Sequence, residues 1–387
     1  MNWPKVKLGD VCEINIGKTP SRSNSRYWGE GHRWLSIADM NQGKWISNTK
    51  EQITDLAIQE SGIKKVPANT VLFSFKLSIG KVCLSETEIY TNEAIAALPI
   101  KNKNTLDTIY LSHVMKSLAF SDMTDNAVMG ATLNKKKLAE VRIPLPSIEE
   151  QKRIAAILDK ADGIRQKREQ AIKLADDFLR AKFLEMFGTP ANNIHRFPTG
   201  KIRDLVDSVN YGTSAKASID SGEYPILRMG NITYQGGWDF TDLKYLDLSV
   251  KEKDKFLVKE GDLLFNRTNS KELVGKTAVY EENRPMAFAG YLIRVRPNPI
   301  GNNYYISGYL NSIHGKITLM NMCKSIVGMA NINAQELQNI EILIPPKHLQ
   351  DEYEIIYKKI KKGLSIYDKS AMQLQLLASN LSNEYFM

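Results

Sequence analysis

The run PSIEEQKRIAAILDKADGIRQKREQAIKLADDFLRAKFLEMF, residues 146–187, decides how the rest of this chain is organised. A proline and Ser147 open it, and Glu150 three residues after Ser147 completes a capping-box pattern, which is typical of a helix start. Gly188 follows the run directly, as is common just after a helix end. The run therefore predicts one long helix over residues 147–187.

A stripe of mostly apolar residues follows this helix at alternating spacings of four and three. A stripe of this width and length predicts packing against a second long helix. The same spacing recurs at the C-terminus from Tyr353 to Tyr385, so we predict two long helices lying antiparallel as a coiled coil. Two unrelated core helices are the alternative. The first stripe consists of Ile154, Leu158, Ala161, Arg165, Arg168, Ile172, Ala175, Leu179, Lys182 and Met186.

Composition limits the classes of protein that the chain can belong to. Its 387 residues suggest two or three domains, and its net charge of +9 permits nucleic-acid binding without requiring it. No apolar run reaches membrane-spanning length, and the N-terminus lacks a secretory signal. Cys12, Cys83 and Cys323 are scattered, which argues against a disulfide framework or zinc site. We therefore expect a cytoplasmic protein with no membrane partner.

The chain is an internal duplication. NKKKLAEVRIPLPSIEEQ at residues 134–151 aligns without a gap with NAQELQNIEILIPPKHLQ at residues 333–350. Both keep an asparagine, a leucine four residues later, alternating aliphatic residues, a proline and a glutamine. The openings LGDVCEINIGKTP from Leu8 and IRDLVDSVNYGTS from Ile202 also align. Because chance similarity would not preserve one order of motifs, we predict two copies of one unit.

Each unit is predicted to be a globular domain followed by a long helix. The predicted domains are 1–146 and 188–345, and the predicted helices are 147–187 and 346–387. Short runs rich in β-branched and aromatic residues predict a small twisted sheet in each domain, so the fold class is α/β or α+β. A pseudo-two-fold axis between the copies would set the helices antiparallel, with one domain at each end.

The predicted strands fall at corresponding places in the two copies. A helix is also predicted in the first domain over residues 108–119. The predicted strands are 34–40, 71–75, 82–84 and 94–100 in the first domain, and 225–229, 263–265, 278–280 and 291–295 in the second.

No catalytic constellation is found in the sequence. It contains no P-loop, no Gly-x-Gly-x-x-Gly after a strand, no His-Glu-x-x-His and no Gly-x-Ser-x-Gly. The Asn/Asp-Pro-Pro-Tyr/Phe element with which amino-methyltransferases hold a flipped base is absent as well. We therefore expect no catalytic residue, metal or cofactor in this chain.

Basic and polar loops with aromatic neighbours occur at corresponding places in both copies. Their lysine, arginine, serine and threonine side chains suit phosphate contacts, and arginine and asparagine also suit base edges. Solvated surface loops are the alternative interpretation. Because similar loops occur at corresponding places in both copies of a basic chain, double-stranded DNA is the predicted partner. The candidate DNA-binding residues are Lys18, Thr19, Ser21, Arg22, Arg26, Lys76, Lys81, Lys135, Lys136, Lys216, Arg228, Asn231, Arg267, Asn269, Lys271 and Lys276.

Two such readers on a helical spacer would contact two separate short sequences. Forty helical residues span roughly 60 Å at ~1.5 Å per residue. This length exceeds one ~34 Å turn of DNA. Because the candidate loops of the two copies differ in sequence, we expect the composite DNA site to be asymmetric.

The motif at the start of the first predicted long helix resembles that of a known protein family. LPSIEEQKRIAAILDKAD, residues 145–162, preceded by GATLNKKKLAEVRIPLP, resembles the central conserved helix of the specificity (S) subunits of type I restriction–modification enzymes. The resemblance covers the whole chain, as recognition domain, helix, recognition domain, helix. It implies a non-catalytic subunit that reads DNA in a complex that methylates adenine.

The resemblance also implies partner subunits. Two modification subunits would dock on the helices and carry S-adenosylmethionine, and restriction subunits would add an ATP- and Mg-dependent translocase and nuclease. The second half departs from the family pattern at KHLQDEYEIIYKKIKKG, residues 347–363, which puts docking at the C-terminal helix in doubt. The candidate partner-binding residues are Glu150, Gln151, Arg153, Ile154 and Gln350.

Two other functions remain open at this point. A stand-alone DNA-binding or scaffold protein could be built from the same duplicated fold. An enzyme with an unrecognised active site is the third possibility, and methyl transfer by the isolated chain would support it.

Overall fold

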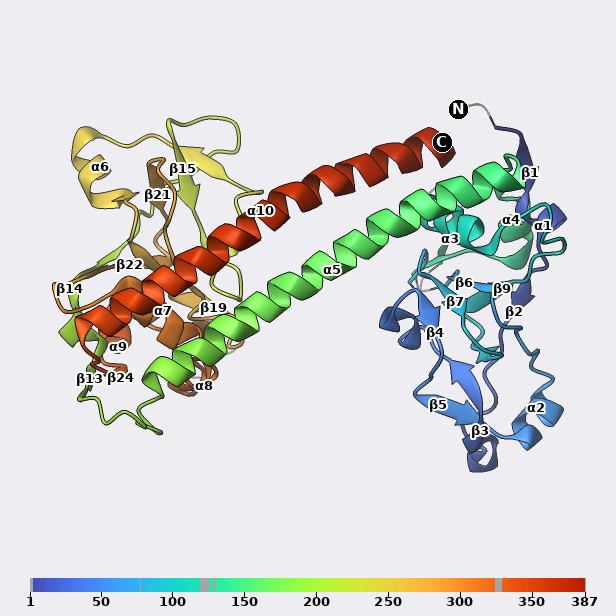
Figure 1. The fold of residues 1–387 in the computed structure, drawn as a ribbon, viewed down its shortest axis with the longest axis horizontal. Helices are drawn as coiled ribbons and strands as arrows, with labels where there is room; N and C mark the ends of the chain where they lie inside the picture. Colours follow the sequence, from blue (N-terminus) through green and yellow to red (C-terminus); the bar gives the residue numbers. More distant parts are fainter. Residues whose placement is uncertain (1–2, 77, 119–124, 128–129, 324–328, 387) are drawn as a thin grey trace. The chain divides into compact units, whose positions relative to one another are not determined.

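The computed structural model consists of two compact units (Figure 1). Unit 1 comprises residues 1–167 and 370–387, and unit 2 comprises residues 168–369. Each unit contains one globular domain and part of both long helices. The structure describes residues 3–76, 78–118, 125–127, 130–323 and 329–386.

The two long helices are α5 (Ile148–Phe187) and α10 (Lys347–Phe386). The prediction of both helices is confirmed to within one or two residues. At the start of α5 the Ser147 hydroxyl accepts a hydrogen bond from the Glu150 amide, at 3.3 Å. The Glu150 carboxylate instead accepts two hydrogen bonds from Arg153, at 2.8 and 2.6 Å, so half of the predicted capping box forms.

Two sheets form the globular domain of unit 1. One has the order β2-β9-β6-β7-β4 and the other the order β5-β3-β8, while β1 pairs with β12 and β10 with β11. The strands are β1 (Lys5–Lys7), β2 (Asn15–Ile16), β3 (Trp28–Leu35), β4 (Trp45–Ile46), β5 (Glu51–Ile53), β6 (Val71–Ser74), β7 (Val82–Ser85), β8 (Tyr90–Thr91), β9 (Ile95–Leu98), β10 (Asp125–Ala127), β11 (Gly130–Thr132) and β12 (Arg142–Pro144). The short helices are α1 (Leu8–Val11), α2 (Asp55–Ser61), α3 (Thr108–Ser117) and α4 (Lys135–Glu140).

Unit 2 repeats this arrangement. Its two sheets have the orders β14-β22-β18-β20 and β16-β15-β21-β17, while β13 pairs with β24 and β19 with β23. The strands are β13 (Thr199–Lys201), β14 (Val206–Tyr211), β15 (Tyr224–Leu227), β16 (Lys244–Leu246), β17 (Leu257–Val258), β18 (Leu263–Asn266), β19 (Thr268–Asn269), β20 (Thr277–Val279), β21 (Met286–Phe288), β22 (Leu292–Pro297), β23 (Ala330–Asn331) and β24 (Glu341–Leu343). The short helices are α6 (Val250–Phe256), α7 (Asn303–Asn311), α8 (Ile313–Met322) and α9 (Ala334–Gln338).

The shared strand order confirms the duplication and the mixed α/β class. In each unit the strand after the opening helical turn pairs with the last strand of the main sheet, β2 with β9 and β14 with β22. The predicted strand 34–40 is wrong beyond Leu35. There Asp39 accepts hydrogen bonds from the Ser36 amide and hydroxyl, and a 3-10 turn (Asp39–Gln42) begins. The predicted end of the first-domain helix at residue 119 lies outside the described residues.

The glutamine shared by both copies of the repeated motif anchors the start of the long helix in each unit. Gln151 is fully buried at the start of α5, where its amide nitrogen donates to the carbonyls of Thr105 and Pro146, both at 2.9 Å. Its amide oxygen accepts from the Asp107 amide, also at 2.9 Å. The side chain therefore joins the long helix to the loop before α3.

Gln350 makes the two equivalent donor contacts at the start of α10. It is fully buried and donates to the carbonyls of Ile300 and Pro345, at 3.0 and 2.9 Å. Ile154 is also fully buried, in the core of unit 1. Burial removes Gln151, Ile154 and Gln350 from direct contact with any partner, which corrects their assignment as docking residues. Only Glu150 and Arg153 of that set reach the surface.

Aromatic packing joins the two long helices within unit 2. Phe183 and Phe187 of α5 lie 5.3 and 5.9 Å from the ring centroid of Tyr353 on α10, and both also contact Tyr305 of α7. Lys361 of α10 forms an ion pair with Asp176 of α5 at 3.0 Å. The end of α5 therefore packs on the beginning of α10, as antiparallel helices require.

The opposite ends of the helices contribute to the core of unit 1. Tyr385 and Phe386 at the end of α10 are buried in the same cluster as Ile154 and Leu158 of α5. The Phe386 ring packs edge-to-face on Tyr110 of α3, with centroids 5.6 Å apart. Each globular domain is thus packed on both long helices.

A partly buried charge cluster connects the first domain to α5. Asp159 of α5 accepts hydrogen bonds from His113 of α3, at 2.7 Å, and from Lys44 in the loop before β4. His113 is only 6% exposed, so burial lowers its pKa, and the positive charges of Lys44 and Lys116 act in the same direction. The hydrogen bond to Asp159 opposes this shift without cancelling it.

Replacing the buried glutamine tests its structural role. Gln151→Met keeps the side-chain volume but leaves the Asp107 amide and two carbonyls without their partner. We expect the free energy of unfolding of unit 1 to fall by about 2 kcal/mol. Urea unfolding followed by tryptophan fluorescence measures it, since Trp238 alone of the five tryptophans lies in unit 2. Gln166→Met, at an exposed site on the same helix, should change little.

The charge cluster predicts a dependence of stability on pH. Because the pKa of folded His113 lies below its usual value, the unfolded chain binds a proton more readily than the folded chain as the pH falls through about 6.5. Stability should therefore decline from pH 7.5 to 5.5, and His113→Gln should reduce that decline. Urea unfolding at several pH values measures both slopes. Equal slopes in the two proteins would contradict the assignment.

Candidate nucleic-acid interface

The first candidate loop leaves the sheet at the same place in both units. A Cβ atom at Gly17 would lie 2.2 Å from the carbonyl oxygen of Thr91, and one at Gly212 would lie 2.3 Å from that of Phe288. Only glycine allows this close approach of two backbones. The loops that begin at Lys18 and Thr213 therefore occupy equivalent positions.

The side chains of the first loop are largely held by unit 1 itself. Lys18 donates to the Ser61 carbonyl at 2.5 Å, and Thr19 is hydrogen-bonded to Glu93. Arg22 forms a two-pronged ion pair with Glu51, which holds the pKa of that carboxyl below its usual range. The Arg22 guanidinium lies 3.8 Å from the ring centroid of Trp28.

These contacts within unit 1 hold the loop in a defined conformation. The Trp28 indole donates to the Ser21 carbonyl at 3.2 Å, so Ser21, Arg22 and Trp28 are organised together. Arg22 remains half exposed, with 53% of its side chain in contact with solvent. A phosphate or base edge would have to compete with Glu51 for this guanidinium. Arg26 in the same loop is exposed.

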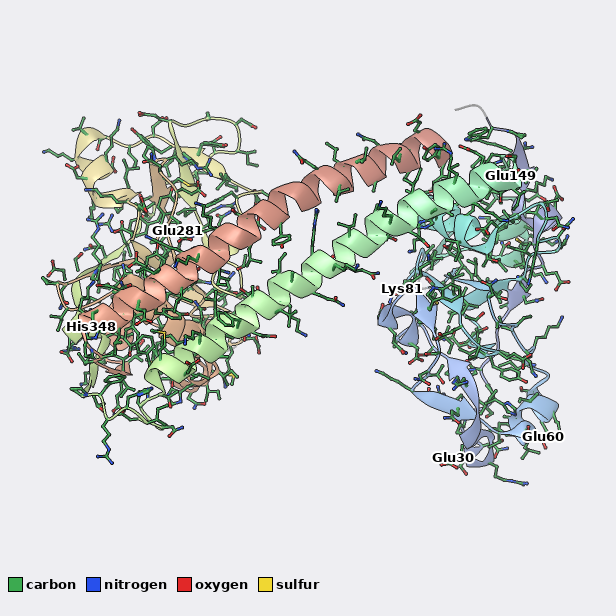
Figure 2. The ribbon with its side chains drawn as sticks, in the orientation of Figure 1. Glu30, Glu60, Lys81, Glu149, Glu281 and His348 are labelled. Atoms are coloured by element: carbon green, nitrogen blue, oxygen red, sulfur yellow. The ribbon has the colours of Figure 1, made fainter. Side chains whose placement is uncertain are left out.

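The remaining candidates of unit 1 lie in the connection between β6 and β7 and in α4. Lys81 donates to the Asn41 amide oxygen at 2.8 Å, and Lys76 lies 5.4 Å from the Phe75 ring. Figure 2 shows Lys81 nearer to α5 than Glu30 and Glu60, which mark the remote end of the first domain. Lys135 and Lys136 are exposed in the first turn of α4.

Three candidates of unit 2 instead stabilise the fold. The buried Asn231 side chain accepts from the Arg228 amide and donates to the carbonyls of Asp239 and Asp242. Arg228 forms an ion pair with Asp242 at 2.8 Å. Lys276 is 8% exposed and donates to the carbonyls of Met229 and Ile232, and burial lowers its pKa. Asn231 and Lys276 are therefore not available to DNA.

The other candidates of unit 2 lie at its surface or close to it. The Arg267 guanidinium lies 4.8 Å from the ring centroid of Tyr211, whose hydroxyl accepts from the Ala334 amide. Asn269 accepts a hydrogen bond from the Ser270 amide at 2.9 Å. Lys216 and Lys271 are exposed. Arg267 stacked on an aromatic ring offers a cation in a defined orientation.

Sequence reasoning missed a polar cavity in unit 1. This hollow of about 610 Å³ is lined by side chains of β3, β5 and β8 and by nearby loop residues, among them His32, Arg33, Gln52 and Lys65. His32 lies 2.8 Å from Asp55, and Lys65 pairs with Glu88 at 3.0 Å. No local motif could have found it, because its residues come from separate strands.

The described residues contain no group of three or more histidine, cysteine, aspartate or glutamate side chains placed to hold a metal ion. The three cysteines are buried free thiols, and burial raises the pKa of Cys12 and Cys83 to about 12. Among the described helices, none is both long and apolar enough to cross a membrane.

Comparison with known proteins shows which family has this architecture. The family model for the type I restriction modification DNA specificity domain matches twice, at residues 1–174 and 196–378. The chain is 26% identical to the StySPI specificity subunit of Salmonella potsdam, covering 92% of this chain and 80% of that one. Its identity with the EcoKI specificity subunit of Escherichia coli (strain K12) is 24%, covering 87% and 78%.

A shorter match and two solved structures agree. The chain is 29% identical to the MjaIX specificity subunit of Methanocaldococcus jannaschii over 48% of this chain and 43% of that subunit. The type I restriction–modification S subunit of M. genitalium has the same fold, with a TM-score of 0.65, 13% identity and coverage of 100% and 96%. A structure from work on assembly and conformational transition of the type I system gives a TM-score of 0.55, 16% identity and coverage of 99% and 97%. The chain therefore belongs to the type I restriction modification DNA specificity family.

Proposed function

We propose that this chain is the non-catalytic DNA-recognition subunit of a type I restriction–modification complex. Each globular domain reads one half of a bipartite, asymmetric site in double-stranded DNA. The long helices set the gap between the halves and dock two modification subunits. S-adenosylmethionine binds to those subunits, and ATP and Mg bind to restriction subunits that join them.

The observation that carries this proposal is one scaffold used twice with different loop side chains. The sheet orders β2-β9-β6-β7 and β14-β22-β18-β20 correspond strand by strand. At the equivalent loops, unit 1 offers Arg22 stacked on Trp28, whereas unit 2 offers the exposed Lys216 and, nearby, Arg267 on Tyr211. Two domains with the same strand order but different loop side chains favour two DNA-binding domains with different sequence preferences.

Exposed apolar side chains on the long helices support docking of partner subunits. Leu174 and Phe178 of α5 are 68% and 49% exposed. On α10, Leu376 and Leu377 are 63% and 53% exposed. Large apolar side chains that stay in solvent on otherwise packed helices favour a protein partner.

Arg267 provides a test of the division of labour between the domains. The Arg267→Ala variant, purified with its modification subunits, should lose base preference in one half of the site, since an arginine–base contact is worth roughly 1–3 kcal/mol. Selection of bound sequences from a random duplex pool measures each half separately. Arg203→Ala, at an exposed arginine of the same unit, should leave both halves intact. Equal loss in both halves would argue against separate readers.

The docking role predicts a defect in assembly. Leu174→Ser with Phe178→Ser removes two exposed apolar groups without disturbing the core. We expect the affinity for the modification subunit to fall by at least about tenfold. Titration followed by gel filtration or calorimetry measures it, with Lys173→Ser on the same helix as the control. Unchanged assembly by the double variant would remove this surface from the docking site.

A further inference from the structure

Unit 2 contains a cavity of about 340 Å³, and Lys271 is the one residue among those lining it that is also a candidate for DNA contact. The cavity lies where α5, α7 and α8 meet the loops around Tyr234 and Lys271. Its wall is apolar on the α8 side, where Ile317 and Met320 line it. The volume lies within the range of small-molecule sites, at the lower end.

Lys316 of α8 brings an uncompensated positive charge to this cavity. Its ammonium nitrogen is buried and has no hydrogen-bond partner among the described residues. The Lys316 ammonium nitrogen lies 4.9 Å from the ring centroid of Tyr234. Burial, and to a smaller extent the positive charges of Arg180 and Lys276, lowers the pKa of Lys316 to about 8. A buried ammonium without an acceptor is costly, and an anionic ligand would relieve that cost.

A second unpartnered atom lies in the same wall. The Asn311 amide nitrogen donates to the Thr277 carbonyl at 2.9 Å and to the Ser307 hydroxyl at 3.2 Å. The Asn311 amide oxygen is buried and has no donor among the described residues. The cavity thus offers one hydrogen-bond acceptor besides its cations.

The charge of the lining favours an anion. Arg180, Lys271 and Lys316 face the cavity against one acid, Glu272. Asp177 lies 3.9 Å from Arg180, so it compensates that guanidinium only weakly. Tyr234, with 44% of its surface exposed, presents a ring on which a flat group could stack.

We propose that this cavity binds a mononucleotide-like ligand, an anion that also carries a flat, hydrogen-bonding ring. Lys316 and Arg180 bind the phosphate, and Tyr234 stacks on the base. Asn311 accepts a hydrogen bond from a base N–H group, and the apolar residues of α8 cover the other face of the ring. Lys271 lines this cavity and is also a candidate DNA-contact residue, but the four side chains assigned to the nucleotide, Lys316, Arg180, Tyr234 and Asn311, are not among the DNA-contact candidates.

Adenosine monophosphate is the probe for this site, titrated into the full-length chain by calorimetry. Lys316→Met should weaken its binding at least about tenfold, the equivalent of one charge-assisted hydrogen bond. Tyr234→Ala, at a half-exposed residue whose removal leaves the core intact, should weaken it as well. Lys251→Met, an exposed lysine of α6 outside the cavity, should bind like the unaltered chain. Inorganic phosphate should bind more weakly than the nucleotide.

A short single-stranded oligodeoxyadenylate distinguishes a free nucleotide from a nucleotide within a strand. Binding of the monophosphate with the predicted variant effects supports the free ligand. No binding of the monophosphate, but oligonucleotide binding that Lys316→Met and Tyr234→Ala weaken, assigns the site to a nucleotide within a strand. Binding of neither probe, or equal binding by Lys316→Met and Lys251→Met, would overturn the proposal. That result would leave the duplex-reading function untouched, since sequence selection by the complex measures it separately.

Discussion

The hydrogen bonds of one buried glutamine at the start of each long helix hold the architecture together. Gln151 and Gln350 each donate to two backbone carbonyls, one just before the helix and one in the loop that leads into α3 or α7. A buried amide that loses such partners costs more than its hydrogen bonds contribute, so geometry at this joint is tightly specified. This side chain therefore helps to fix the direction in which each helix leaves its domain.

Around this shared joint the two units use different contacts. Unit 1 adds the cluster of His113, Asp159 and Lys44, whereas unit 2 uses an aromatic cluster around Phe183 and Tyr353. In unit 2 Asn302, which caps α7 as Asp107 caps α3, donates to Asp351 and Glu354 of α10. The duplication has thus preserved the attachment of domain to helix while the supporting side chains diverged. A reading subunit needs this combination, because its domains must be held firmly while their contact loops vary.

Much of the fold could be predicted because periodicity and repetition are visible in a sequence. Both long helices and the two-copy organisation could be predicted for that reason. The contacts of the polar side chains could not be predicted, because they depend on partners far away in the chain. Thr19 meets Glu93, and Lys276 reaches carbonyls more than forty residues earlier. The glutamines were assigned to docking because they belong to the helix motif whose resemblance implies partner subunits, and a motif does not distinguish burial from exposure.

The most direct test of the central claim is a map of methylated adenines. The chain would be co-expressed with its modification subunits in a host that lacks them, and methylated positions would be determined across the host DNA. Two readers joined by helices predict a motif of two different specified stretches separated by a gap of fixed length and free sequence. A single continuous motif, or no new methylation despite a stable complex, would contradict the account.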